Sequence, residues 1–274
     1  MTSLAGAVQA VGSEDVLESL RVNGKSRSGV DTTADEASSL SLKPTVSVDS
    51  TIDLKSARAG RQSAVDDALN RISSVYLIAK RATDIVGSLL GLLFVSPLVA
   101  IVAILTKMSD GGPVFYPHTR VGKWGREFTC YKFRTMVVNA DTIKADIAHL
   151  NSHDDHRTFK VPDDPRVTSI GRWLRRTSID EVPQLWNVLR GEMSLVGPRP
   201  PVPYEVEYYD LDDMQRLMVK PGLTCIWQVS GRSRLPFPEQ LEMDLEYIER
   251  RSYWFDLKLM LRTLPAVLSA DGAY

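Results

Sequence analysis

The stretch IVGSLLGLLFVSPLVAIVAILT, residues 85–106, contains no charged residue and is dominated by Leu, Ile, Val, Ala and Phe. As an α-helix, a stretch of this length covers about 30 Å of hydrocarbon. Lys80 and Arg81 precede it and Lys107 follows it, so basic residues flank both ends. The stretch therefore predicts a helix that enters a membrane. A buried helix of a soluble protein fits less well, because such helices seldom run this far without a charge.

Ser96 and Pro97 lie in the middle of this stretch. Proline lacks a backbone N–H and clashes with the preceding turn, so a kink is expected there. The cytoplasmic flanks of membrane segments usually carry the positive excess, and here both flanks are basic. A re-entrant helix-break-helix that enters and leaves on one face explains these features. A spanning helix with a proline kink explains the same residues about equally well.

Composition divides the chain into three regions. Residues 1–72 are rich in Ser, Thr, Ala, Asp and Lys and hold no aromatic residue, so we predict a disordered N-terminal tail. Residues 73–110 contain the membrane segment. Residues 111–274 mix strand and helix patterns and are predicted to form a folded domain on the cytoplasmic face.

This third region predicts an α+β fold that is mainly helical. Val114–Tyr116 and Glu127–Phe133 have the composition of short strands, joined across a glycine-containing turn. Helices are expected over residues 141–150, around Met214 and over residues 239–249.

The stretch from Tyr253 to Leu264 mixes aromatic and aliphatic residues with Asp256, Lys258 and Arg262. Such a mixture suits a helix that lies at a membrane interface. A helix that turns its apolar face to the protein core explains the stretch equally well.

The overall charge and the cysteines exclude two classes of protein. The net charge is −1, so no basic excess points to a nucleic-acid partner. Cys130 and Cys225 are the two cysteines, and neither belongs to a CxxC pair or a metal-ligand spacing. We therefore expect no disulfide framework, in keeping with a reducing cytoplasmic setting.

The adjacent carboxylates Asp180 and Glu181 are the candidate reactive pair. Apolar residues at 182, 185, 186 and 189 have helical spacing, so a helix is predicted to begin near this pair. Ser178 to Glu181 also matches a capping box, and spacing alone favours that structural role. Against a cap at Ser178, Pro183 would then lie beyond the first turn, where it removes a hydrogen bond. A start at Asp180 places both carboxylates at the mouth of the helix.

Arginines lie close to this pair in the sequence. Arg172, Arg175 and Arg176 precede it, and Arg199 follows in a Gly-Pro-Arg-Pro turn. Arginine forks match phosphate oxygens, while one carboxylate can bind Mg²⁺ and another can attack phosphorus. The pattern therefore indicates phosphoryl chemistry, and a set of surface ion pairs is the alternative.

From about Tyr76 to its C-terminus the chain resembles the bacterial sugar transferases, the monotopic polyprenyl-phosphate phosphoglycosyl transferases that start exopolysaccharide and O-antigen synthesis. The motifs that carry the resemblance are, in order, Lys80-Arg81-Ala82-Thr83-Asp84, Ser96-Pro97, Gly112-Pro113-Val114-Phe115-Tyr116, Tyr131-Lys132-Phe133-Arg134-Thr135-Met136, Asp164-Pro165-Arg166-Val167-Thr168, the run from Gly171 through Asp180-Glu181 to Gly197-Pro198-Arg199-Pro200, Lys220-Pro221-Gly222-Leu223-Thr224 and Trp227-Gln228-Val229-Ser230-Gly231-Arg232.

The resemblance implies a reaction at the cytoplasmic face of the bacterial inner membrane. A UDP-hexose donates a hexose-1-phosphate to polyprenyl (undecaprenyl) phosphate, and UMP leaves. Asp180 would be the nucleophile that forms a covalent phosphosugar intermediate, and Glu181 would ligate Mg²⁺. A homodimer is possible by the same resemblance.

The resemblance also assigns supporting roles. Arg175, Arg199 and Lys132 would bind the substrate phosphates. Ser96-Pro97 would be the break of a re-entrant helix, which favours the hairpin over the spanning helix.

One residue departs from the family pattern, because Cys225 stands where glycine is common. A competing hypothesis is a non-catalytic, membrane-associated partner of a polysaccharide assembly complex, which would be free to lose the charged residues. A multispanning transferase is excluded by hydropathy, since a single segment is long enough to enter the bilayer. For the sugar we expect glucose or galactose.

Overall fold

The protein is described here by a computed structural model that covers residues 60–143, 146–151, 161, 163–231 and 235–269. Contacts divide the chain into two units, residues 1–67 and residues 68–274. Residues 60–70 are helical, although we predicted a disordered tail to residue 72, because this stretch is rich in helix-forming residues. The remainder of the predicted tail, residues 1–59, lies outside the described residues.

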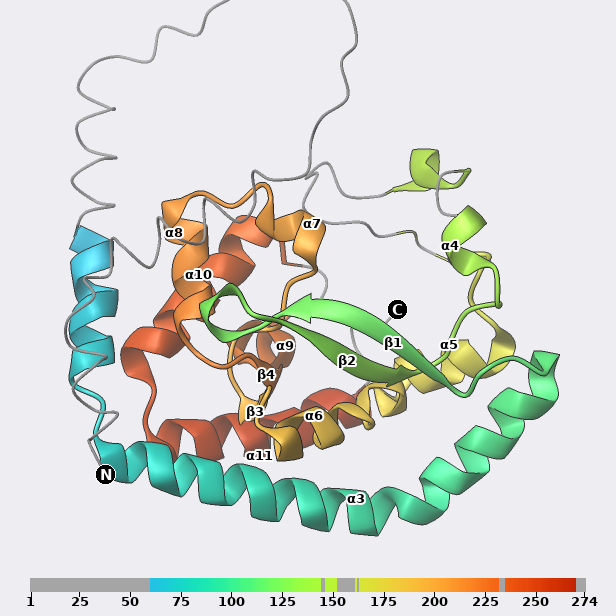
Figure 1. The fold of residues 1–274 in the computed structure, drawn as a ribbon, viewed down its shortest axis with the longest axis horizontal. Helices are drawn as coiled ribbons and strands as arrows, with labels where there is room; N and C mark the ends of the chain where they lie inside the picture. The colour runs from blue at the N-terminus through green and yellow to red at the C-terminus, as the bar shows by residue number, and fades with distance from the viewer. Residues whose placement is uncertain (1–59, 144–145, 152–160, 162, 232–234, 270–274) are drawn as a thin grey trace, which may run out of the picture. The chain divides into compact units, whose positions relative to one another are not determined.

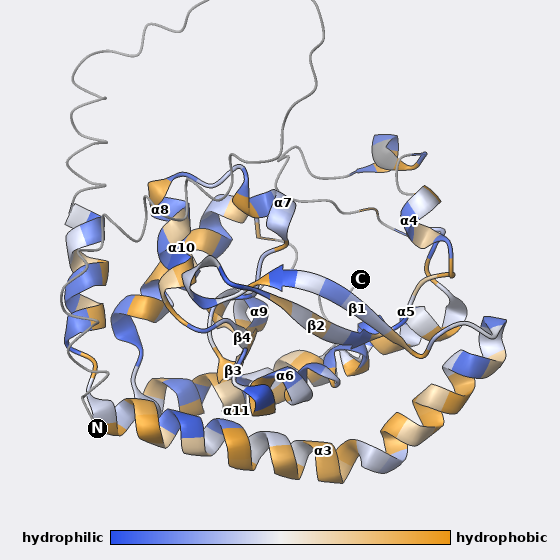
Figure 2. Ribbon diagram, viewed as in Figure 1, coloured by the Kyte–Doolittle hydropathy of each residue, from blue (hydrophilic) through white to orange (hydrophobic). Residues whose placement is uncertain are grey.

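Helix α3, Ser74–Asp110, contains the apolar stretch, and among the described residues it is the one helix long and apolar enough to cross a membrane. It begins at a Ser73 cap, whose side chain accepts from the N–H of Val75, and ends at Gly111 in the left-handed region. Figure 2 shows apolar residues along its length.

Pro97 lies inside α3 without interrupting it. Its missing N–H would have bonded to the carbonyl of Leu93, four residues earlier. The hydroxyl of Ser96 donates to that carbonyl instead, at 2.8 Å. The membrane segment is therefore one continuous helix that bends (Figure 1), where the sequence predicted two helices separated by a break.

Strands β1, Phe115–Val121, and β2, Glu127–Phe133, form an antiparallel ribbon in which Phe115 lies opposite Phe133. The second strand matches its predicted bounds. The first is longer than Val114–Tyr116, because a two-stranded ribbon leaves one edge of each strand unpaired and so tolerates Pro117. A second pair, β3 (Ser194–Val196) and β4 (Gly222–Thr224), is parallel.

Short helices build the remainder of the second unit, as the mainly helical α+β prediction requires. They are α4 (Ala140–Ile143), α5 (Ser169–Arg176), α6 (Gln184–Arg190), α7 (Pro203–Val206), α8 (Leu211–Met214), α9 (Ile226–Ser230), α10 (Phe237–Arg250) and α11 (Tyr253–Ser269), with 3₁₀ turns η1 (Lys123–Gly125), η2 (Ala148–Leu150), η3 (Ile179–Glu181) and η4 (Gln215–Met218).

The predicted helices near the C-terminus are confirmed by α10 and α11. The helix expected over residues 141–150 is replaced by the single turn α4 and the 3₁₀ turn η2, with residues 144–145 outside the described part. Neither turn is long enough to be stable without packing, so local propensity could not set these bounds.

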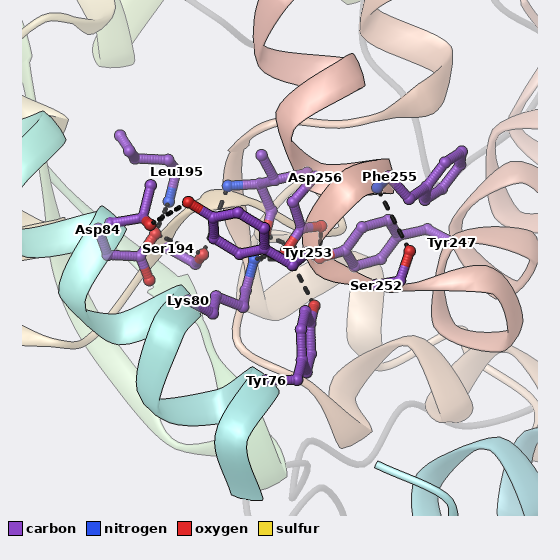
Figure 3. Close-up of polar contacts among 12 residues, drawn as sticks. Tyr76, Lys80, Asp84, Ser194, Leu195, Tyr247, Ser252, Tyr253, Phe255 and Asp256 are labelled. Carbon is purple, nitrogen blue, oxygen red and sulfur yellow. Dashed lines mark hydrogen bonds and ion pairs between the residues drawn. The ribbon is translucent and has the colours of Figure 1, made fainter. Parts of the chain in front are cut away.

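The first part of α3 is held to the rest of the second unit by a buried polar cluster (Figure 3). Lys80 donates to the carboxylate of Asp256 on α11 at 2.8 Å and to the carbonyl of Val196 at 2.9 Å. The hydroxyls of Tyr76 and Tyr247 donate to the same carboxylate, at 2.9 and 2.8 Å. This network satisfies a buried charge and ties α3 to α11.

Two further residues of the same turn anchor α3. Arg81 donates to the carbonyls of Val188 and Leu189 at 2.7 Å each and so caps the C-terminus of α6. Asp84 accepts at 2.9 Å from the hydroxyl of Ser194 and from the following backbone N–H. The Lys-Arg-Ala-Thr-Asp motif therefore docks the helix.

The last part of α3 packs against the same unit. Val102 is buried in a cluster with Phe133 of β2 and Leu174 of α5. Asp110, at the end of the helix, forms an ion pair with Arg134. Both ends of the apolar helix are thus fixed to one domain.

Helix α5 approaches the chain after β2 so closely that Gly171 is required. A Cβ at this position would lie 1.9 Å from the carbonyl oxygen of Thr135. That carbonyl accepts the N–H of Thr168 at 3.0 Å and so cannot move away cheaply. The contact sets the position of α5 and of the arginines it carries.

We predict that Gly171→Ala lowers the free energy of unfolding by at least about 2 kcal/mol, because the added methyl group meets rigid backbone. Thermal unfolding followed by circular dichroism measures the change. Gly60→Ala is the control, since nothing lies within 4 Å of its Cβ position. A Gly171→Ala protein that unfolds at the wild-type temperature would contradict the close approach.

Candidate active site

The carboxylate pair lies in the 3₁₀ turn η3, between α5 and α6. Helix α5 ends at Arg176, and Ser178, two residues later, lies in the left-handed region with φ of 57°, so the chain reverses sharply before Asp180. The side chain of Ser178 makes no capping hydrogen bond, so the capping box is not formed.

The helix predicted to begin at Asp180 begins instead at Gln184. Pro183 has no N–H to bond back to η3, so the 3₁₀ turn and α6 are separated at this residue. Asp180 and Glu181 therefore occupy a tight turn rather than the first turn of a helix.

Two cations of the predicted set contact Glu181. The Nζ of Lys132, on β2, lies 2.6 Å from Oε1 of Glu181 and 3.9 Å from Oδ2 of Asp180. The Nη2 of Arg199, in the loop after β3, lies 3.1 Å from the same Glu181 oxygen. Residues 132, 180, 181 and 199 therefore meet in space, as the phosphate-binding prediction requires.

Arg175 lies at the end of α5 and is held through its Nε, which donates to the hydroxyl of Thr135 at 2.9 Å. Its charge acts on Asp180, and both residues line one cavity. Because this hydrogen bond uses only the Nε, the two terminal nitrogens of the guanidinium can still bind an anion.

The two carboxylates differ in their electrostatic surroundings. Burial raises the pKa of Asp180 above its ordinary value, and Lys132 offsets only part of this effect. Burial also acts to raise the pKa of Glu181, but Lys132 and Arg199 outweigh it and hold this pKa well below its usual range. Glu181 is thus a firmly ionised carboxylate that is paired with both cations through Oε1, while Asp180 is the more basic of the two.

Arg120 lies on β1 and was not among the site residues predicted from the sequence. Its Nη1 donates to the carbonyl of Pro200 at 2.9 Å, and its charge acts on Arg199 and Glu205. Alternate residues of β1 at 116, 118 and 120 line the cavity. That period-two pattern would have revealed Arg120 if the strand had been extended beyond residue 116.

The loop that carries Arg199 is held by residues distant in the sequence, which no local sequence pattern indicates. Arg216 donates from Nη2 to the carbonyl of Arg199 at 3.1 Å and from Nη1 to the hydroxyl of Tyr209 at 2.8 Å. Its guanidinium also forms a buried ion pair with Asp244 of α10, at 2.5 Å. This chain of contacts fixes the loop that presents Arg199.

Lys132 is positioned by Asn187, which is fully buried on α6. The amide oxygen of Asn187 accepts the N–H of Tyr131 at 3.1 Å, and its nitrogen donates to the carbonyl of Thr129 at 2.6 Å. The side chain thus pairs with β2 as a neighbouring strand would, and the next residue along, Lys132, faces the carboxylates.

A cavity of about 1330 Å³ contains this site. Asp180, Glu181 and Arg199 line it, and so do apolar side chains of α11 that include Met260 and Leu264. Such a cavity can hold a ligand with a charged head and an apolar chain.

The carboxylates were also tested as a magnesium site. No cluster of three or more His, Cys, Asp or Glu side chains suited to a metal occurs in the part of the chain that the structure describes. Mg²⁺ is usually held by one or two carboxylates together with substrate phosphates and water, so Asp180 and Glu181 fit an ion that arrives with a diphosphate.

Comparison with known proteins identifies related sequences. The family model described as "Bacterial sugar transferase" matches residues 75–270. The galactosyl transferase CpsE of Streptococcus agalactiae is 47% identical over 199 residues, which are 72% of this chain and 44% of the relative.

Two further relatives differ in length. The exopolysaccharide production protein ExoY of Rhizobium meliloti is 42% identical over 200 residues, 72% of this chain and 88% of the relative. The undecaprenyl-phosphate galactose phosphotransferase of Salmonella typhimurium is 43% identical over 217 residues, 77% of this chain and 44% of the relative. The chain therefore spans less than half of two of these relatives and most of the third.

We predict that Asp244→Asn lowers the free energy of unfolding by about 3–5 kcal/mol, because it leaves Arg216 buried without a counter-charge. Urea unfolding measures this. Glu246→Gln on the same helix removes an exposed ion pair with Arg250, so it should cost no more than about 1 kcal/mol. If the free energy of unfolding fell equally in the two variants, the buried ion pair would contribute no more to stability than the exposed one, and the prediction would be wrong.

Proposed function

The chain belongs to the bacterial sugar transferase family, and from that premise we propose that it transfers a hexose-1-phosphate from a UDP-sugar to polyprenyl (undecaprenyl) phosphate, as the first step of exopolysaccharide synthesis. The observation that carries the proposal is the buried pair Asp180 and Glu181, with Lys132 and Arg199, in a cavity that apolar side chains of α11 also line. Phosphate groups would bind at the cations, and a polyprenyl chain would contact the apolar side chains.

Substrate binding follows from the cations. Arg199 and Arg175 present guanidinium groups to the cavity, and Lys132 adds an ammonium group between the two carboxylates. These three would bind the diphosphate of the donor and disperse the charge that develops on the transferred group. Glu181, with Asp180 beside it, would hold Mg²⁺, which supplies further charge neutralisation when bound.

The first chemical step is attack by a carboxylate oxygen of Asp180 on the sugar-bearing phosphorus. A new bond joins this oxygen to phosphorus, and the bond from the same phosphorus to the bridging oxygen breaks, so UMP leaves with the electron pair. The raised pKa of Asp180 supports this role, because the more basic carboxylate is the better nucleophile.

The second step releases the intermediate. A phosphate oxygen of the polyprenyl phosphate attacks the same phosphorus, the bond to Asp180 breaks, and the free carboxylate is restored. The product is a polyprenyl diphosphate sugar. Galactose stands in the names of two of the relatives, so galactose-1-phosphate and glucose-1-phosphate are the first donors to test.

The attachment of α3 supports a re-entrant path through the membrane. A helix of 37 residues is about 55 Å long, so a spanning helix would place its ends on opposite faces. Here Lys80 pairs with Asp256 near one end and Asp110 pairs with Arg134 at the other, all within one unit. The bend at Pro97 would allow both ends to stay on the cytoplasmic face.

We predict that the purified chain releases UMP from UDP-galactose or UDP-glucose in the presence of Mg²⁺ and polyprenyl phosphate. With donor alone, intact-mass spectrometry should detect a covalent hexose-phosphate adduct, and Asp180→Asn should abolish it because the amide is a poor nucleophile. Glu239→Gln, an exposed change on α10, is the control and should keep the adduct. An adduct that persists in Asp180→Asn would show that another residue is the nucleophile.

The membrane path has its own test. Ser74→Cys and Ser109→Cys place thiols at exposed positions near the two ends of α3, while the native cysteines are buried. Both thiols should react with a membrane-impermeant maleimide in inside-out vesicles and neither in right-side-out vesicles. Phe94→Cys, near the bend, should be shielded in both. Labelling of the two ends from opposite sides would establish a spanning helix.

A further inference from the structure

Four cations gather in the second unit in a region that the proposed reaction does not use. Arg81 of α3, Lys123 of η1, Lys220 before β4 and Arg251 between α10 and α11 form this basic cluster. The Cβ position of Gly191 lies 3.4 Å from the Nη2 of Arg81 and 3.5 Å from the Nζ of Lys220, so these two charges are neighbours. Segments far apart in the sequence thus bring like charges together.

The other members of the cluster are close enough to repel one another. Burial lowers the pKa of Lys123, and the charges of Arg251 and Lys220 lower it further. Burial and the charge of Arg81 also lower the pKa of Lys220. Asp84 acts on Lys220 and Asp256 on Arg251 in the opposite direction, but the pKa of each cation stays below its ordinary value. Like charges are costly to assemble, so a cluster that is only partly compensated favours the binding of an anion.

The acidic residues nearby are already engaged. Asp256 is held by Lys80 and two tyrosine hydroxyls, and Asp84 accepts from Ser194. Arg81 donates only to backbone carbonyls. Among the residues described, Lys123, Lys220 and Arg251 form no ion pair, and the Nε of Arg251 is buried without a hydrogen-bond partner.

Aromatic side chains that suit a membrane interface accompany the cluster. Lys123 lies over the ring of Trp124, with Nζ 4.7 Å from the ring centroid. Tyr253 and Trp254 begin α11 two residues after Arg251, and both are exposed, with 75% of Trp254 accessible to solvent. Tryptophan and tyrosine gather at the headgroup level of membranes, where Lys and Arg attract anionic lipids.

We infer that this basic cluster binds the headgroup phosphate of an anionic phospholipid beside the first turns of α3. The inference rests on the membrane attachment in the proposed function. It adds a lipid site that is separate from the acceptor site, since none of the four cations lines the cavity that holds Asp180. A bound headgroup would reduce the repulsion within the cluster and hold the η1 hairpin turn and the start of α11 against the leaflet.

The test is a titration of phosphatidylglycerol into the full chain in neutral detergent, with lipid-bound protein counted by native mass spectrometry. Each Lys or Arg near an anionic surface contributes about 1 kcal/mol, so Lys123→Gln/Lys220→Gln should weaken binding by roughly 30-fold. Lys123→Arg/Lys220→Arg keeps both charges and should bind like the wild type. Phosphatidylcholine should not saturate the site.

A matched control removes two exposed cations from α11, as Lys258→Gln/Arg262→Gln. If phosphatidylglycerol bound this control as weakly as it binds Lys123→Gln/Lys220→Gln, lipid binding would reflect general surface charge, and the proposed site would be refuted. Competition by glycerol 3-phosphate at equal concentration would assign the cluster to soluble phosphates and overturn the lipid assignment.

UMP release by the same preparations separates this inference from the proposed function. Neutral detergent supplies no anionic lipid, so transfer there should stay within about 2-fold in Lys123→Gln/Lys220→Gln. Activity without selective lipid retention would refute the lipid site alone. Lipid retention without UMP release from any UDP-sugar would refute the transferase function alone.

Discussion

The pairing of Glu181 with Lys132 and Arg199 is the interaction on which the site depends. Each partner comes from a different element: the turn η3, the strand β2 and the loop after β3. Removing three charges from water is costly unless they neutralise one another, so folding must bring these elements into register. Residues behind the site provide that register, because Asn187 fixes β2 and Arg216 fixes the loop. The neighbouring Asp180 is left buried with less compensation, which is how one of two adjacent carboxylates becomes the more basic.

Buried ion pairs and charged hydrogen bonds also attach the apolar helix α3 to the rest of the second unit. On one turn of α3, Lys80 pairs with Asp256, and Asp84 accepts a hydrogen bond from a backbone N–H of β3. At the far end of the helix, Asp110 pairs with Arg134. Hydrophobic packing alone would let an apolar helix slide or rotate, since one apolar face resembles another. Paired charges have one low-energy arrangement, so they define where the helix lies. The cavity that contains the carboxylates is also lined by α11, which packs beside α3.

Part of this architecture follows directly from local sequence. The apolar stretch, strand β2 and helices α10 and α11 follow from composition and periodicity over neighbouring residues. The candidate site residues 132, 175, 180, 181 and 199 follow from the sequence mainly through resemblance to a family. Local rules failed where distant contacts decide: the start of α6 was placed four residues too early, β1 was cut short at a proline, and the break in α3 is a bend.

The sequence by itself thus determined the membrane helix, the mainly helical class and the identity of the charged residues that meet at the site. Only the tertiary structure decided their partners and their unequal pKa values. Asn187, Arg216 and Asp244 act through contacts with residues distant in the sequence, and no periodic pattern reports such contacts. The pKa difference between Asp180 and Glu181 depends on which carboxylate lies nearer to Lys132 and Arg199. Coulomb energy depends on the distance between charges and on their burial, and neither can be read from the fact that two residues are adjacent in the sequence.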